Sequence, residues 1–166
     1  MQWRAWLLCC AALPAHAGAQ DAAALVNPFH DPFVPVTSAM AGCPVPEAPR
    51  YTAQQVRDLN HERTQHGASC YLSGRCRLAN SYLYDAEIVP RVQQYIRQDG
   101  RFDDTSVWVL GQRRIVTLLG CVPSAAQARL LEQAVGLVDD VMGVVNLLYV
   151  PGAGAAQAPY PVAPQR

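Results

Sequence analysis

Proline is concentrated at the two ends of this chain, and this distribution restricts a packed domain to the middle. Residues 20–50 contain six prolines and residues 151–166 contain four, whereas residues 51–150 contain two. Proline fixes the backbone angle φ and lacks the N–H that a helix needs, so neither end can hold a long helix. We therefore predict an extended proline-rich arm over 20–50, a folded part over 51–150 and a disordered tail over 151–166.

The length and composition fit one modest domain with extensions. Of 166 residues, 51% are hydrophobic and 16% are charged, which argues against a multidomain enzyme and against a chain that is disordered throughout. The 13 basic residues, all of them arginine, balance 13 acidic residues. A net charge of zero argues against a nucleic-acid partner held by bulk electrostatic attraction.

The first 19 residues have the three parts of a secretory signal peptide. Arg4 provides the positive start, an apolar run covers 5–13, and small residues at 15–17 or 17–19 form a cleavage site. This run is far shorter than the ~20 apolar residues of a membrane-spanning helix, and no later stretch is long enough. We predict a signal peptide over 1–19, export to a bacterial periplasm and no transmembrane segment in the mature chain.

This segment has two alternative interpretations. A buried N-terminal helix would have the same apolar run. Lipidation at Cys9 or Cys10 is disfavoured, because Leu8 or Cys9 would stand where the lipoprotein motif needs Gly, Ala or Ser.

Export places the remaining cysteines in an oxidising compartment. Cleavage leaves Cys43, Cys70, Cys76 and Cys121, and an even number there indicates two disulfides with three alternative pairings. Ser73-Gly74 can turn the chain back between Cys70 and Cys76, so we favour Cys70–Cys76 and, by elimination, Cys43–Cys121. A zinc site is the alternative, but structural zinc ligands are typically paired about two to four residues apart, which this spacing does not match.

Residues 51–85 are predicted to form a cysteine- and arginine-rich helical extension. Thr52 and Gln55 have the spacing of a capping box, which predicts a helix from there to about Gln65. Its apolar stripe is thin, so this helix must pack against another element.

Residues 86–150 alternate between helix and strand patterns. Ile88, Val92, Tyr95 and Ile96 lie on one face of a helix over 86–99, strand-type runs over 106–110 and 114–122 form a hairpin, Ser124 caps a helix over about 125–138, and a strand covers 144–150. The order helix, strand, strand, helix, strand predicts an α+β fold. We expect a small mixed three-stranded sheet with two helices on one face, preceded by the disulfide-stapled helical extension.

Two spacings in this segment are more specific than the alternation alone, namely V-x-L-x-G-x-V and a closing V-x-x-V-x-N-x-L-x-V. They are carried by the run Val116-Thr117-Leu118-Leu119-Gly120-Cys121-Val122 and by Val141, Val144, Asn146, Leu148 and Val150, with Ile88, Val92, Ile96, Val107, Val109 and Ala128 before or between them. Through these residues, 86–150 resembles the BON domain family. Arg114 replaces the usual hairpin glycine, and Asp140 replaces the glycine before the last apolar run.

The resemblance implies a small module of bacterial envelope proteins that is not catalytic. It further implies binding to phospholipid or a membrane surface, or assembly with envelope proteins, and no cofactor. It covers about 65 of 166 residues, and residues 20–85 have no match.

Motifs for catalysis or metal binding fail on spacing or position. His61 and His66 are five residues apart, about 140° around a helix, whereas the zinc-protease signature needs a spacing of four. Asp103-Asp104 and Asp139-Asp140 fall where a helix gives way to a strand, as solvated turn residues do. We predict no enzymatic activity and no metal site.

The predicted sheet has two apolar faces. Alternate residues of a strand share a face, and the helices would cover Val107, Val109, Val116, Leu118, Val122, Val144, Leu148 and Val150. The second face carries Trp108, Leu110, Ile115, Leu119, Cys121, Val145, Leu147 and Tyr149, and is too apolar to be left in water. Because Cys121 needs a partner from 43–76, we predict that residues 43–84 fold back over this face. A protein partner or lipid is the alternative cover.

Positive charge gathers on the extension and the hairpin. Five arginines against Asp58 and Glu62 give residues 50–77 a net charge of +3, and Arg113 and Arg114 form a basic hairpin tip. We predict contacts with an anionic phospholipid or a partner through Arg75, Arg77, Arg113, Arg114 and Tyr71, at ~1 kcal/mol for each base near an anionic surface. An ordinary solvated surface is the alternative.

These features favour a periplasmic envelope module, peripheral to the outer membrane, that binds phospholipid or the membrane surface. The alternative is a protein-interaction subunit of an envelope assembly that docks through the proline-rich arm or tail.

Overall fold

A computed structural model describes residues 25–152 and 157–164. The predicted signal peptide lies outside these residues. Within the described part, no helix combines the length and the hydrophobicity needed to cross a membrane. The elements in chain order are β1 (Phe33–Pro35), α1 (Ala53–Gly67), α2 (Ser69–Leu72), the 3-10 helix η1 (Ser81–Tyr84), α3 (Asp85–Asp99), β2 (Ser106–Gln112), β3 (Ile115–Cys121), α4 (Ala125–Gly136) and β4 (Gly143–Tyr149).

The helices begin where the sequence places their caps. Thr52 and Gln55 form the reciprocal capping box at the start of α1, and the hydroxyl of Ser124 accepts the N–H of Gln127 at the start of α4. Each cap satisfies N–H groups that have no partner inside the helix. The predicted starts of both helices are confirmed.

The sheet is mixed and has four strands in the order β1-β2-β3-β4. β2 and β3 form the predicted antiparallel hairpin, and β4 runs parallel to β3. The prediction of three strands is wrong, because three residues of the proline-rich arm pair as β1 along the outer edge of β2. So short a strand leaves no periodic pattern, and Pro35 is tolerated there because an edge strand does not need every N–H.

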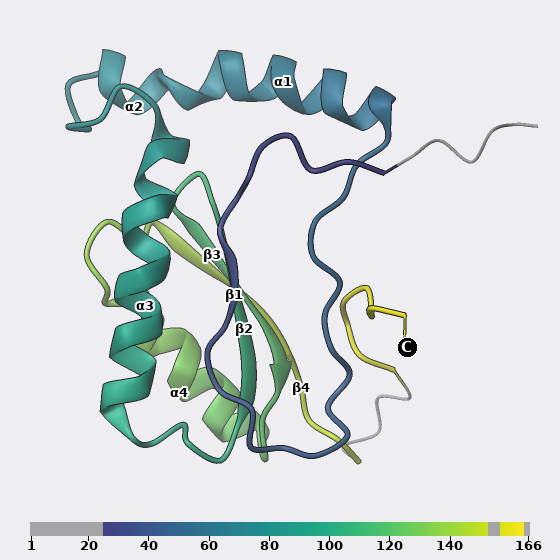
Figure 1. Ribbon diagram of the computed structural model, residues 1–166. Helices are drawn as coiled ribbons and strands as arrows, with labels where there is room; N and C mark the ends of the chain where they lie inside the picture. Colours follow the sequence, from purple (N-terminus) through teal and green to yellow (C-terminus); the bar gives the residue numbers. More distant parts are fainter. Residues whose placement is uncertain (1–24, 153–156, 165–166) are drawn as a thin grey trace, which may run out of the picture.

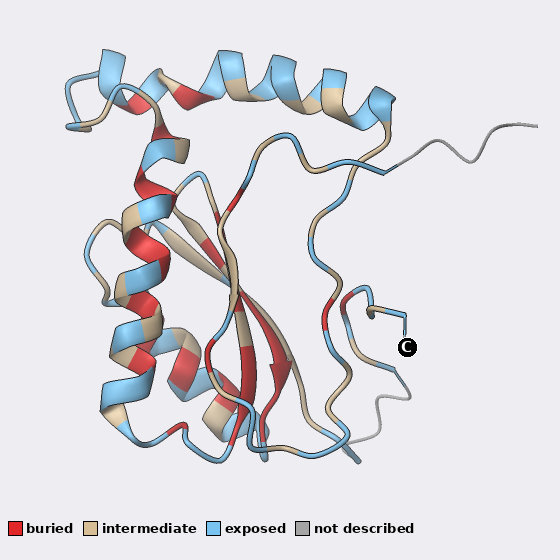
Figure 2. Ribbon diagram, in the orientation of Figure 1, coloured by how far each residue is buried: buried red, intermediate tan, exposed pale blue. Residues whose placement is uncertain are grey.

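The core lies between the sheet and the two helices that cover one of its faces, α3 and α4 (Figure 1). Figure 2 shows the buried residues along the strands and on the inner sides of these helices. The buried or half-buried strand residues of this core are those predicted for it: Val107, Val109, Val116, Leu118, Val122, Val144, Leu148 and Val150. The predicted α+β arrangement of this segment is confirmed.

α1 crosses the hairpin end of the sheet, and the arm after β1 runs along the side of the sheet away from α3 (Figure 1). A disulfide joins Cys43 of the arm to Cys121 at the end of β3, with Cα atoms 5.8 Å apart across 78 residues of chain. Cys70 and Cys76 form the second disulfide, so the favoured pairing is confirmed. The cover is incomplete, since Leu119 is buried whereas the side chain of Val145 on β4 is 43% exposed.

The end of the chain packs against the arm. Tyr160 is buried, and its hydroxyl donates to the carbonyl of Pro44 at 2.9 Å. The N–H of Ala163 donates to Val45 O at 2.8 Å. The prediction of a disordered tail is therefore wrong for residues 157–164. The composition of this tail indicates disorder. The non-proline residues of the tail and of the arm still have backbone N–H groups, and these pair the two segments. Tyr160 adds apolar area that the contact buries.

Candidate functional site

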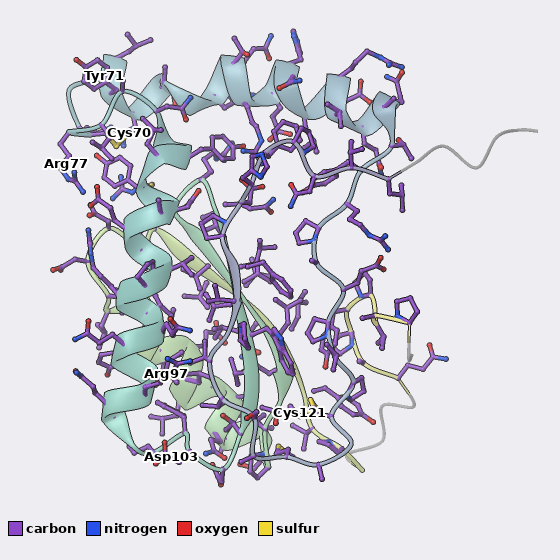
Figure 3. The ribbon with its side chains drawn as sticks, in the orientation of Figure 1. Cys70, Tyr71, Arg77, Arg97, Asp103 and Cys121 are labelled. Atoms are coloured by element: carbon purple, nitrogen blue, oxygen red, sulfur yellow. A yellow bond between two sulfur atoms is a disulfide. The ribbon has the colours of Figure 1, made fainter. Side chains whose placement is uncertain are left out.

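A small loop closed by the Cys70–Cys76 disulfide extends from the far end of α1 at a corner of the molecule (Figures 1 and 3). It contains the four-residue helix α2 and a turn through Gly74, whose φ of +70° suits glycine. Cys70 is buried, but the side chain of Tyr71 is 48% exposed and that of Leu72 is 80% exposed. The disulfide therefore holds an aromatic and an aliphatic side chain in water on a short, constrained loop.

Arg75 adds a positive charge to this loop. Its side chain is exposed, and its Nε donates to Ser73 Oγ at 3.1 Å within the loop. Among residues 25–152 and 157–164, no acidic side chain forms an ion pair with its guanidinium. Tyr71, Leu72 and Arg75, which we call the loop tip, thus combine apolar area with a cation.

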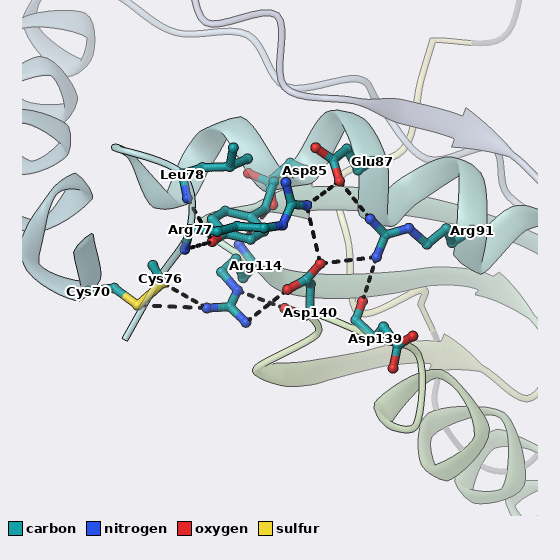
Figure 4. A network of polar contacts seen from close by, with 11 residues as sticks. Cys70, Cys76, Arg77, Leu78, Asp85, Glu87, Arg91, Arg114, Asp139 and Asp140 are labelled. Carbon is teal, nitrogen blue, oxygen red and sulfur yellow. Dashed lines mark hydrogen bonds and ion pairs between the residues drawn. A yellow bond between two sulfur atoms is a disulfide. The ribbon is translucent and has the colours of Figure 1, made fainter. Parts of the chain in front are cut away.

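Arg77 lies just beyond the disulfide and takes part in a network of ion pairs (Figure 4). It pairs with Glu87 of α3 and lies 3.6 Å from Asp140 Oδ2. Arg91 bridges the same two carboxylates, at 2.7 Å from Glu87 and 3.1 Å from Asp140. Through Arg77, hydrogen bonding holds the pKa of the Glu87 carboxyl below its usual value. The charge of Arg77 is therefore largely compensated within the protein.

Arg114 at the hairpin tip is half-buried against the disulfide. Its Nη1 lies 3.0 Å from the Sγ of Cys76 and 3.8 Å from that of Cys70. Its Nε donates to the carbonyl of Asp140 at 2.8 Å, and its guanidinium lies 4.6 Å from the ring centroid of Tyr84. Arg114 thus joins the extension, the hairpin and the loop before β4.

Asp85 holds the hairpin turn in an uncommon conformation. Arg113 and Arg114 both have positive φ, 56° and 67°, as the two central residues of a type I′ turn must, although glycine or asparagine is preferred there. The carboxylate of Asp85, buried at the start of α3, accepts both backbone N–H groups at 2.7 and 2.8 Å. These bonds stabilise the positive φ that Arg113 and Arg114 adopt in the turn.

Burial raises the pKa of Asp85 to about 6, while the N–H groups of Arg113 and Arg114 act in the opposite direction. A pKa above the unfolded value means that protonation favours the folded state. The stability from this group is complete below pH 3.8 and is lost as the pH rises through about 6. The pKa values of Glu87, Asp99 and Asp140 are lowered instead. The stability that these three groups contribute is lost only as the pH falls through their lowered pKa values.

We predict that the free energy of unfolding falls by about 1 kcal/mol between pH 5 and pH 7.5 through Asp85. Asp85→Asn should abolish this slope. It should also cost about 1–3 kcal/mol at pH 5, because an amide nitrogen has no lone pair for one of the two N–H groups. Urea unfolding at both pH values measures both effects. The exposed Asp103→Asn is the control, and an unchanged slope in Asp85→Asn would contradict the assignment.

Arg113 points to a different region from Arg114. Its Nη1 lies 3.8 Å from Glu62 of α1, and both line a pocket of about 350 Å³ between α1 and the second face of the sheet, together with Leu59, Arg63, Tyr82, Gln112, Ile115, Thr117 and Val145. At its edge the guanidinium of Arg63 lies 4.0 Å from the centroids of Phe29 and of Tyr82 and pairs with buried Asp31. This stack fixes α1 over the hairpin end of the sheet.

The five predicted binding residues therefore divide into three groups. Tyr71 and Arg75 lie together on the exposed loop tip, Arg77 and Arg114 belong to the ion-pair network beside the disulfide, and Arg113 lines the pocket. Sequence reasoning missed Leu72, whose position inside the six-residue disulfide loop was a usable signal for exposure. It also missed Glu87 and Asp140 as partners of the arginines. Among the described residues, no group of histidine, cysteine and acidic side chains could hold a metal ion.

Comparison with known families agrees with this fold. Residues 84–152 match the model of the BON domain family, so α3, the hairpin, α4 and β4 form a BON domain. BON domains are modules of periplasmic and envelope proteins and are generally not catalytic. None of the curated proteins compared with the chain matches it.

Proposed function

We propose that this BON-domain protein is a non-catalytic periplasmic module that binds the surface of an anionic phospholipid membrane through the loop tip. The observation that carries the proposal is the exposure of Leu72 beside Tyr71 on a loop closed by a disulfide. Adjacent exposed apolar side chains beside polar and charged ones are typical of a surface that meets a membrane or a protein.

The chemistry of the loop tip fits the interface of a bilayer. Inserting the side chain of Leu72 would contribute ~2 kcal/mol, and tyrosine is favoured at the level of the lipid headgroups. Arg75 would add ~1 kcal/mol against an anionic surface. The disulfide reduces the conformational entropy that binding would cost, because the loop is already ordered.

The proposed membrane contact includes fewer arginines than the charge pattern of the sequence predicts. Glu87 and Asp140 compensate Arg77 and Arg114, and Arg113 faces Glu62. Replacing these three arginines should therefore change membrane binding less than replacing Arg75.

Co-sedimentation with vesicles of phosphatidylglycerol and phosphatidylcholine at low salt tests the proposal. We expect Leu72→Ser to weaken binding about tenfold and Arg75→Gln about fivefold. Raising the salt concentration should abolish the difference between Arg75→Gln and the unaltered protein.

One exposed residue of α4 and the exposed residue that follows this helix provide matched controls. Leu137 is 82% exposed and follows α4, and Arg129 is exposed on the same helix. Leu137→Ser and Arg129→Gln should leave binding unchanged. Equal losses in the loop and control variants, or no binding at low salt, would overturn the proposal and favour a protein-interaction subunit of an envelope assembly.

A further inference from the structure

The two disulfides lie in different chemical surroundings. Cys121 is fully buried, and the sulfur of Cys43 lies 3.8 Å from the carbonyl oxygens of Pro44 and Ser106, which are neutral groups. Cys76, by contrast, is half-buried between two exposed residues, Arg75 and Arg77. Cys43 is half-buried as well, so each disulfide joins one buried and one half-buried cysteine, and the two bonds differ in the charged groups around their sulfurs.

A positive group contacts the second disulfide directly. The guanidinium of Arg114 lies 3.0 Å from the sulfur of Cys76 and 3.8 Å from that of Cys70 (Figure 4). A cation at this distance stabilises a thiolate and so makes the sulfur a better leaving group.

The surrounding ion pairs hold this positive group in place. Arg77, Arg91 and Arg114 share two carboxylates, those of Glu87 and Asp140. With the carboxylate of Asp85, which accepts the backbone N–H of Arg114, the formal charges of the network balance, and the guanidinium of Arg114 is the charged group in contact with the two sulfurs. Two hydrogen bonds that do not involve the sulfurs hold Arg114: its backbone N–H donates to Asp85, and its Nε donates to the carbonyl of Asp140. Its guanidinium therefore stays in place when the sulfurs separate.

We propose that Cys70–Cys76 is a site of reversible thiol–disulfide exchange with a protein dithiol, whereas Cys43–Cys121 is a structural bond. A thiolate of the dithiol attacks the sulfur of Cys76, and the electron pair of the S–S bond passes to Cys70 as a thiolate near Arg114. The second thiol of the partner gives its proton to the Cys70 thiolate and attacks the partner's sulfur in the mixed disulfide with Cys76, which breaks that S–S bond and releases Cys76 as a thiolate. The partner leaves as a disulfide, two electrons having moved to this protein.

Reduction would release the loop tip from its closed conformation. If the proposed membrane contact is right, the reduced protein should bind anionic vesicles less tightly, because the loop must then be ordered on binding. This consequence rests on the proposed function, but the exchange itself does not.

Stepwise reduction of the folded, full-length protein tests the exchange. The protein is incubated with increasing dithiothreitol, quenched with acid, alkylated and mapped by mass spectrometry. We expect Cys70 and Cys76 to become alkylated at dithiothreitol concentrations at least about tenfold lower than Cys43 and Cys121. Reduction of both pairs at the same concentration, or of Cys43–Cys121 first, would overturn the proposal without any variant.

Variants of the hairpin tip test the role of Arg114. Arg114→Gln should slow the reduction of Cys70–Cys76 about tenfold, Arg114→Lys should restore part of the rate, and Arg113→Gln should leave it unchanged. A circular dichroism melt of each variant confirms that it is folded. An equal rate in Arg114→Gln and the unaltered protein would overturn the role of Arg114. A variant that loses vesicle binding while its Cys70–Cys76 disulfide is reduced no faster would bear on the proposed membrane contact and not on the exchange.

Discussion

Replacing Cys43 and Cys121 together by serine is expected to lower the free energy of unfolding by about 4 kcal/mol. The bond spans 78 residues, and the chain-entropy model gives long loops the largest stabilisation because the unfolded chain loses most freedom. It is also the covalent tie between the arm and the second face of the sheet. The paired replacement avoids a free thiol that could form a wrong disulfide.

Urea unfolding followed by tryptophan fluorescence measures this loss. Trp108 is the single tryptophan beyond the predicted signal peptide, and it lies on the second face, paired with Leu119 across the hairpin. Its emission should therefore shift to the red in the variant even before the domain unfolds. The paired serine replacement of Cys70 and Cys76 is the comparison and should cost only about 2 kcal/mol, because its loop spans six residues. A loss in the Cys43 and Cys121 variant no larger than this would show that the arm is held by other contacts.

Local patterns were sufficient for the parts of the fold that short-range physics determines. The capping box at Thr52 and the alternation of apolar residues in β2 and β3 each depend on neighbours within a few residues. The pairing of Cys43 with Cys121 also followed, although the residues are far apart, because the turn at Ser73-Gly74 favoured Cys70–Cys76 and left these two cysteines to pair. A long-range contact is predictable from sequence where a local pattern requires a partner and few residues can be that partner.

Other contacts could not be read from the chain because nothing local marks them. β1 is three residues of the proline-rich arm, and Tyr160 packs on Pro44, 116 residues away. In the binding region, a charge count treats each arginine alike. Only the fold shows that Glu87 and Asp140 compensate Arg77, whereas no acidic residue of the described part of the chain pairs with Arg75. The narrower membrane site proposed above follows from that difference.

Replacing Gly120 by alanine is expected to cost at least about 3 kcal/mol, because the added methyl group has no space and the backbone does not suit it. Gly120 has a φ of +112°, and a Cβ there would lie 2.0 Å from the backbone oxygen of Ser106. That oxygen belongs to β2, which pairs with β3 along the whole hairpin. The clash can be relieved only by separating the two strands, since a backbone atom cannot rotate away as a side chain can.

Gly136→Ala is the matched control, and the contrast identifies the cause. Gly136 is the last residue of α4, and a Cβ there would lie 3.9 Å from Val144, an ordinary contact. Because alanine favours the helix over glycine, this variant should be unchanged or more stable by up to about 1 kcal/mol. Urea unfolding of both variants gives the comparison. If Gly120→Ala lost less than about 1 kcal/mol, β2 and β3 could not approach each other as closely as the structure has them, and the glycine of the V-x-L-x-G-x-V spacing would need another explanation.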